Sequence, residues 1–327
     1  MNTISTIKKL LLLHKSMRVN ELAQLTGVSK QMIHRALVAL IQSGEIQKIG
    51  RAPKTFYELV QHVSEPVVPC TAIERSQEDF LKQHFIIVTE IGKRLEGIEA
   101  MLFWCERQKL PVEKTVNEYI QTRKKYLNFY DKNQLINGAD KLKNTKGFSE
   151  IGLDEIYYLD FYAIERFGKT RLGTLLHFAK QGQNRKLMEE ICNTIKPIVL
   201  NFIAKEKIDA VAYIPPTIKR ETQFMKVLQQ QLNFPLPHLK IMKVSGEIAV
   251  PQKALSKIED RIANAKASLQ PLEKRTFQHV LLIDDAVGSG ASMNETALKL
   301  KTNFTAKKIT AIAIVGSYKG FDVTQEI

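Results

Sequence analysis

Cysteine is scarce in this chain, which has three among its 327 residues. Cys70, Cys105 and Cys192 are too scattered for a local metal-binding motif and too few for a disulfide framework. The scarcity argues against a small disulfide-stapled domain and against a cysteine-rich zinc module. We therefore expect a protein of a reducing compartment, the cytoplasm.

Long apolar runs are also lacking. No stretch approaches the roughly 20 residues that a membrane-spanning helix needs, and the apolar patch at residues 10–13 is not followed by a signal-peptide cleavage pattern. Internal repeats and low-complexity tails are absent as well. The sequence therefore predicts no membrane partner and two or three globular domains.

Acidic residues are outnumbered, because 48 Lys and Arg face 34 Asp and Glu, which gives a net charge of +14. Such a surplus favours a polyanionic partner, either nucleic acid or a phosphorylated ligand, but says nothing about the fold. The surplus is concentrated at the N-terminus. Residues 1–60 hold nine Lys and Arg against three acidic residues, so +6 of the +14 lies there.

Residues 1–62 have the pattern of three short helices and a hairpin. Apolar residues at helical spacing predict a first helix ending near His14, a second over 20–26, and a third over 30–42 capped by Ser29. Two short strands, at 45–49 and 55–60, follow. This arrangement resembles the winged helix-turn-helix of many bacterial regulators, which implies DNA or an RNA–DNA hybrid as a partner.

In such a module the third helix enters the major groove and the hairpin reaches phosphates or the minor groove. The residues that we expect to bind nucleic acid are Ser29, Lys30, Gln31, His34, Arg35, Arg51 and Lys54. Two other interpretations stay open. The module could serve dimerisation or protein docking, and the basic residues could simply be solvated.

Residues 72–145 are predicted to form a helical connector after a proline-containing linker. Apolar residues at three- and four-residue spacings predict a helical stretch over about 73–109, which Gly92 and Gly97 could divide, and another helix that begins at Pro111. A long amphipathic helix pair can be a homodimer interface or a lid over the following domain. The pattern does not separate these two roles.

Residues 146–327 alternate strands with helices, the pattern of an α/β fold with a doubly wound parallel sheet. The strongest segment is 280–292, VLLIDDAVGSGAS, which reads as a buried strand, two adjacent carboxylates, a Gly/Ser turn and the start of a helix. In such a turn, backbone N–H groups converge on an anion at the positive end of the helix. Because carboxylates repel a bare phosphate, Asp284 and Asp285 indicate a ligand with hydroxyl donors, such as a ribose, or a bound cation.

This segment resembles the phosphoribosyl pyrophosphate (PRPP) signature of type I phosphoribosyltransferases. The resemblance implies that Asp284 and Asp285 are catalytic, hold the ribose hydroxyls and act with Mg²⁺. It departs at Gly288, where the family usually has a hydroxyl side chain. A plain strand end with solvated acids is the alternative. The residues of the turn that we expect to bind substrate are Val287, Gly288, Ser289, Gly290, Ala291 and Ser292.

A second resemblance lies upstream, where residues 251–256, PQKALS, are followed by Arg261 and Asn264. The pattern is similar to that of ComF-type phosphoribosyltransferase-like proteins, and it implies that Gln252 and Arg261 contact the substrate. A capped surface helix is the alternative explanation. The chain lacks the zinc module with which that family commonly begins.

The segment after the strand at 210–214 also departs from that family. Pro215-Pro216 is followed by Arg220-Glu221-Thr222-Gln223, where ComF-type proteins have Arg-Gly-Phe-Asn. Without that glycine the backbone approaches a pyrophosphate differently. We expect Lys219 or Arg220 to pair with the pyrophosphate through charge instead.

Three functions remain open on these grounds. The favoured one is a transferase that displaces pyrophosphate from C1 of PRPP with a nitrogen nucleophile or water. The second is a regulator with PRPP as effector, as in the purine repressor of Gram-positive bacteria. The third is an antiviral defence effector of the retron type. The acceptor, the nucleic-acid sequence and the oligomeric state do not follow from the sequence.

Overall fold

The computed structural model describes residues 3–51, 54–60, 73–145, 147–216, 220–244, 255 and 257–317. The chain divides into two compact units, residues 1–71 and residues 72–327. Among the described helices, none combines the length and the apolar composition needed to cross a bilayer.

The N-terminal unit has the three helices and the hairpin that the sequence predicts, together with one strand that it does not. Gly27 turns the chain between the second and third helices with a φ of +69°, and the Ser29 hydroxyl accepts a hydrogen bond from the Met32 N–H at 3.4 Å. The extra strand pairs with β3, so the sheet is antiparallel with the order β1-β3-β2. The elements are α1 Thr3–His14, β1 Ser16–Met17, α2 Val19–Thr26, α3 Lys30–Gln42, β2 Ile46–Arg51 and β3 Lys54–Leu59.

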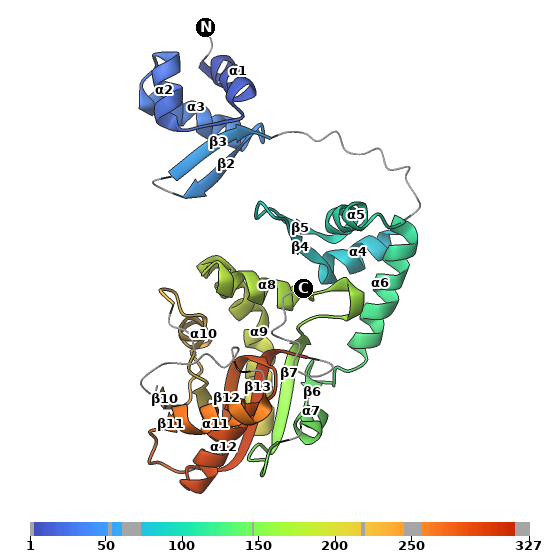
Figure 1. The fold of residues 1–327 in the computed structure, drawn as a ribbon, viewed down its shortest axis with the longest axis vertical. Helices are drawn as coiled ribbons and strands as arrows, with labels where there is room; N and C mark the ends of the chain where they lie inside the picture. Colours follow the sequence, from blue (N-terminus) through green and yellow to red (C-terminus); the bar gives the residue numbers. More distant parts are fainter. Residues whose placement is uncertain are drawn as a thin grey trace. The chain divides into compact units, whose positions relative to one another are not determined.

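The larger unit is an α/β fold around a six-stranded, mostly parallel sheet (Figure 1). The strand order is β6-β7-β13-β12-β8-β9, and only the edge pair β6–β7 is antiparallel. The predicted doubly wound sheet is therefore present in its parallel, α/β form. The strands are β6 Ile136–Asn137, β7 Glu155–Phe161, β8 Ala210–Tyr213, β9 His238–Leu239, β12 Phe277–Val287 and β13 Ala306–Gly316.

Helices cover both faces of this sheet, because alternate residues of its strands enter two different cores. On β12, Val280 and Leu282 face one core, and Leu281 and Ile283 face the other. A strand buried on both faces must be apolar throughout, which is why its sequence shows no alternation. The first core contains α11 Ile258–Ser268 and α12 Ala291–Thr302, and the second contains α8 Arg171–Gln181, α9 Arg185–Glu206 and α10 Phe224–Leu232.

The predicted helical stretch at 73–109 is wrong in its middle. Residues 86–96 form a hairpin between α4 Arg75–His84 and α5 Gly97–Gln108, with β4 Ile86–Val88 paired to β5 Arg94–Glu96. Gly92 turns the hairpin at a φ of +80°, and Thr89 closes it by accepting a hydrogen bond from the Lys93 N–H at 3.0 Å. Strands of three residues are too short to show the alternation of apolar and polar residues by which a strand is recognised in a sequence.

Two further helices complete this region, α6 Val112–Leu127 and α7 Ala139–Asn144. Buried residues of α4, α5 and α6 share one hydrophobic core with β7, β12 and β13. The segment 72–145 is thus packed as part of the larger unit. The chain between β10 Ile241–Lys243 and β12 contains α11 and β11 Leu269–Pro271, and β11 pairs with β10.

Candidate functional site

The sheet has a topological switch point between β8 and β12. From β8 the chain crosses through α10 to β9 on one side, whereas from β12 it crosses through α12 to β13 on the other. At such a point the two connections diverge and leave a crevice beyond the carboxyl ends of the strands. A cavity of about 210 Å³ lies there, lined by residues 214–216 after β8 and by residues 284–292, which run from the end of β12 into α12.

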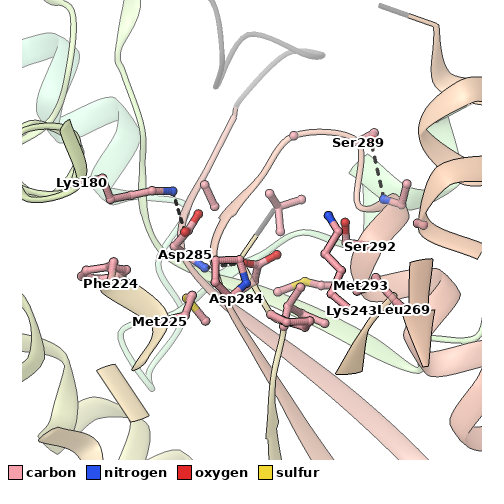
Figure 2. A pocket seen from close by; sticks show the side chains of 18 of the residues that line it. Lys180, Phe224, Met225, Lys243, Leu269, Asp284, Asp285, Ser289, Ser292 and Met293 are labelled. Atoms are coloured by element: carbon pink, nitrogen blue, oxygen red, sulfur yellow. Dashed lines mark hydrogen bonds and ion pairs between the residues drawn. The ribbon is translucent and has the colours of Figure 1, made fainter. Parts of the chain in front are cut away.

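The turn from β12 into α12 forms one end of the cavity (Figure 2). Gly290 caps α12 in the left-handed region at a φ of +82°, and the Ser289 hydroxyl accepts a hydrogen bond from the Ala291 N–H at 3.4 Å. This φ favours glycine, and a Cβ there would also lie 2.7 Å from Cδ2 of the buried Leu142, which would have to shift. Asn294, fully buried in the next turn, holds the helix start in place. Its Oδ1 accepts from the Gly152 N–H and its amide donates to the Glu150 carbonyl, both at 2.9 Å.

Two cations lie near this end of the cavity, both of which line it. Arg261 of α11 is buried, and its Nη1 would be 3.7 Å from a Cβ on Gly288. Lys243 of β10 is the other. Burial lowers the pKa of the Arg261 guanidinium and of the Lys243 ammonium. An anion bound at the amino end of α12 would stabilise both charges.

The acid pair lies in the middle of the cavity. Burial raises the pKa of Asp284, and the adjacent charge of Asp285 raises it further, while the Asp285 N–H and Lys180 oppose the shift. That N–H donates to Asp284 Oδ1 at 2.7 Å. Since the ionised form of Asp284 is destabilised, the carboxylate gains most from a partner that brings hydroxyl donors or a cation.

The opposite end of the cavity is formed by α8 and the start of α10. Figure 2 shows Lys180, Phe224 and Met225 on one side of the acid pair, and Ser289 and Ser292 on the other. Lys180 Nζ donates to Asp285 Oδ2 at 2.6 Å. His177 lies one turn before Lys180 and lines the same cavity, with its Nδ1 3.3 Å from the Tyr162 hydroxyl oxygen.

The structure brings most of the expected substrate residues into this cavity. The lining includes Arg220, Arg261, Asp284, Asp285 and every residue of the turn, Val287, Gly288, Ser289, Gly290, Ala291 and Ser292. Lys219 and Gln252 lie outside the described residues. Their assignment therefore stays a prediction.

The expected nucleic-acid residues gather on α3. Ser29, Lys30, Gln31, His34 and Arg35 are all exposed, whereas Ile33, Ala36 and Leu37 face the core. The backbones of Arg51 and Lys54 end β2 and begin β3, and their side chains lie outside the description. These placements are compatible with the predicted contact face, which stays a prediction.

Sequence reasoning did not assign four of the lining residues, Tyr162, His177, Lys180 and Lys243. They lie on α8, on β10 and after β7, between 37 (280 − 243) and 118 (280 − 162) residues before the first residue of the signature segment. The only signal for them in the sequence was the clustering of His177 and Lys180 in one helix after an aromatic strand. Nothing in the spacing connects either residue to Asp285.

The acid pair supplies two carboxylates, which is enough for a magnesium ion only if a ligand and water provide the remaining oxygens. Within the described ranges, no cluster of three or more His, Cys, Asp or Glu residues is arranged to hold a metal. The described residues therefore form no metal site from protein groups alone. Mg²⁺ is commonly held by one or two carboxylates together with phosphate oxygens and water, and Asp284 and Asp285 provide that number.

If the cavity binds ribose 5-phosphate, we predict that Gly288→Thr tightens this binding by up to about tenfold, because the added hydroxyl can donate to the phosphate. Position 288 has room, since a Cβ would meet only Arg261 Nη1 at ordinary contact distance. The measurement is calorimetric titration of the wild type and the variant. Gly288→Val, which has the same shape without the hydroxyl, is the control, and equal tightening by Val would contradict the prediction.

Comparison with known proteins adds little to this geometry. No family model matches the chain, and no curated protein matches its sequence. Among solved structures, a hypoxanthine phosphoribosyltransferase from Staphylococcus aureus is similar over 41% of this chain and 65% of its own, at 12% identity and a TM-score of 0.24. So distant a likeness carries no argument about this chain.

Proposed function

We propose that the cavity binds PRPP or a related ribose phosphate, and that the protein transfers or releases the phosphoribosyl group. The observation that carries the proposal is the order of groups along the cavity. A phosphate cradle with the buried Arg261 lies at one end, a carboxylate pair in the middle, and Lys180 on the other side of that pair, while Arg220 also lines the cavity (Figure 2). This order matches a ligand whose hydroxyls lie between two anionic groups.

Each part of the ligand has a counterpart in the chain. The N–H groups at the start of α12, with the Ser289 and Ser292 hydroxyls, would hold the 5′-phosphate. Asp284 and Asp285 would accept hydrogen bonds from the ribose hydroxyls, which fixes the sugar and exposes its C1. During transfer the C1–O bond breaks and its electron pair leaves with the pyrophosphate. The acceptor lone pair then forms the new bond to C1, and the proton that the acceptor loses passes to the released pyrophosphate or to solvent water.

Mg²⁺, when bound, would neutralise charge on the leaving pyrophosphate. Asp284 and Asp285 are the residues that would contribute to holding it. Arg220, which follows β8 and lines the cavity, would also neutralise charge on the leaving pyrophosphate. Preorganised charges of this kind stabilise a leaving anion without reorganisation at the moment of reaction.

The test is calorimetric titration of the full chain with PRPP and Mg²⁺, followed on the same sample by an assay for released pyrophosphate. Binding with release is expected for a transferase or hydrolase. Binding without release, in the presence of a panel of amine and nucleobase acceptors, would favour a PRPP-sensing regulator. The absence of binding to PRPP and to ribose 5-phosphate would refute the proposal.

We further propose that the N-terminal unit is a winged helix-turn-helix that binds DNA or an RNA–DNA hybrid through α3. The support is the exposed face of α3, where Lys30, Gln31, His34 and Arg35 occur together on a module with a charge of +6. Because positive charge on a regular helix matches the phosphates that flank a major groove, this face is suited to nucleic acid. If the cavity senses PRPP, its occupancy would then bias this binding.

Replacing Lys30 and Arg35 by alanine should weaken binding to duplex DNA and lower the salt dependence of the binding constant by about one to two units of log–log slope. The measurement is fluorescence anisotropy across a series of salt concentrations. Lys9→Ala with Lys186→Ala is the matched control, since it removes the same charge from exposed positions outside α3. An unchanged slope in the α3 variant would indicate a protein-docking module instead.

A further inference from the structure

Lys180 forms an ion pair with one of the two carboxylates that the proposed function assigns to the sugar. Its Nζ donates to Asp285 Oδ2 at 2.6 Å, and the two side chains keep only 25% and 18% of their exposure. The partners come from α8 and β12, which are far apart in the sequence. The fold therefore places the Lys180 ammonium next to the acid pair as a counter-ion.

A ligand that engages Asp285 must compete with this ammonium group. Ribose hydroxyls and the Lys180 ammonium are both hydrogen-bond donors, and both are directed to carboxylate oxygens. An ammonium displaced within a half-buried cavity loses a charge partner and is poorly solvated there. Binding is therefore favoured when the ligand also offers an anion that receives the displaced cation.

The position of Lys180 decides which anion can receive it. The 5′-phosphate would lie at the cradle, on the other side of the acid pair from Lys180 (Figure 2). On the Lys180 side, a hydrogen bond links the segment after β8 to the turn after α8. The Thr222 N–H donates to Gln183 Oε1 at 2.8 Å. Lys180 and Arg220 thus line the cavity from segments that are bound to each other.

We propose that Lys180 is a specificity-determining residue. It acts as an exchangeable counter-ion of Asp285, so that the site prefers ribose phosphates with a second anionic group at C1 over those with a 5′-phosphate alone. The inference rests on the proposed function, since it concerns the same site. Lys180 would let the site distinguish ribose phosphates with an anionic group at C1 from those without one, which the signature segment by itself does not do.

The experiment compares the affinities of PRPP and ribose 5-phosphate for the full chain by calorimetry, in the presence of Mg²⁺. For Lys180→Met we expect PRPP to bind about tenfold more weakly, the effect of one lost charge partner, while ribose 5-phosphate binds as well as before or better. Lys180→Arg keeps the cation and should keep the preference. Lys186→Met, an exposed position at the start of α9, is the control for loss of a lysine.

The outcomes separate the inference from the proposed function. Equal weakening of both ligands by Lys180→Met would show that Lys180 only orders the acid pair, and this would overturn the inference alone. An unchanged ratio of the two affinities would do the same. A wild-type protein that binds neither ribose phosphate would overturn the proposed function and the inference together.

Discussion

Replacing Asp284 and Asp285 together by asparagine is expected to lower the affinity for ribose 5-phosphate at least about a hundredfold, because each carboxylate contributes a charge-assisted hydrogen bond of about 1.5–3 kcal/mol. The fold should persist. Burial and mutual repulsion already raise the pKa of Asp284, so removing both charges relieves that repulsion, and this gain offsets the loss of the half-buried ion pair between Lys180 and Asp285. Calorimetric titration measures the affinity, and thermal unfolding measures the stability.

The control for this variant is Glu78→Gln with Asp79→Asn. These are adjacent, exposed carboxylates on α4, so the control removes the same charge away from the cavity. It should bind ribose 5-phosphate like the wild type. Unchanged affinity in the Asp284 and Asp285 variant would sink the assignment of the sugar site, whereas a large fall in its unfolding temperature would show a structural role for the pair.

The strand, turn and helix of the signature segment were predictable because consecutive residues determine them. Four apolar residues, two acids and a Gly/Ser turn occur within 13 consecutive residues, and each has a role set by its neighbours in the chain. The structure places them as strand β12, the turn at Gly290 and helix α12. Most of the residues expected to bind substrate line one cavity for the same reason, because neighbours in a short segment necessarily lie close together in space.

The rest of the site could not be predicted, because it is made by tertiary contacts. Lys180 and Lys243 reach the cavity from α8 and β10 only after the sheet has formed in its observed strand order. The hairpin at residues 86–96 was missed for a different reason. Its apolar residues also satisfy helical spacing, and only the backbone shows that Gly92 adopts a positive φ.

Arg123→Met is expected to destabilise the larger unit by about 3–5 kcal/mol, the usual cost of leaving one partner of a buried ion pair alone. Arg123 of α6 forms a bidentate pair with Asp160 of β7 at 2.9 and 3.1 Å, and both side chains are only 6% exposed. The Tyr130 hydroxyl donates to the same carboxylate at 2.7 Å. The pair therefore joins the helical segment to the central sheet through a buried charge. Chemical denaturation of the full chain measures the effect.

Lys114→Met is the matched control, because Lys114 lies on the same helix but its pair with Glu118 is exposed, at 74% and 39%. Such pairs contribute about 0.5 kcal/mol or less, so this variant should unfold like the wild type. Arg123→Met with Asp160→Asn should recover part of the loss, since no unpaired buried charge remains.

Hydrogen exchange can show whether the helical segment and the sheet unfold together. They share one hydrophobic core and this buried pair, so peptides from α6 and β7 should lose protection to the same degree in Arg123→Met. If α6 alone became unprotected while β7 kept its wild-type rates, residues 72–145 would unfold independently of the sheet, as a helical connector between two domains could. Joint loss would instead identify the segment as part of the scaffold that holds the cavity, because α7, which follows α6, contributes the Leu142 side chain that packs against Gly290.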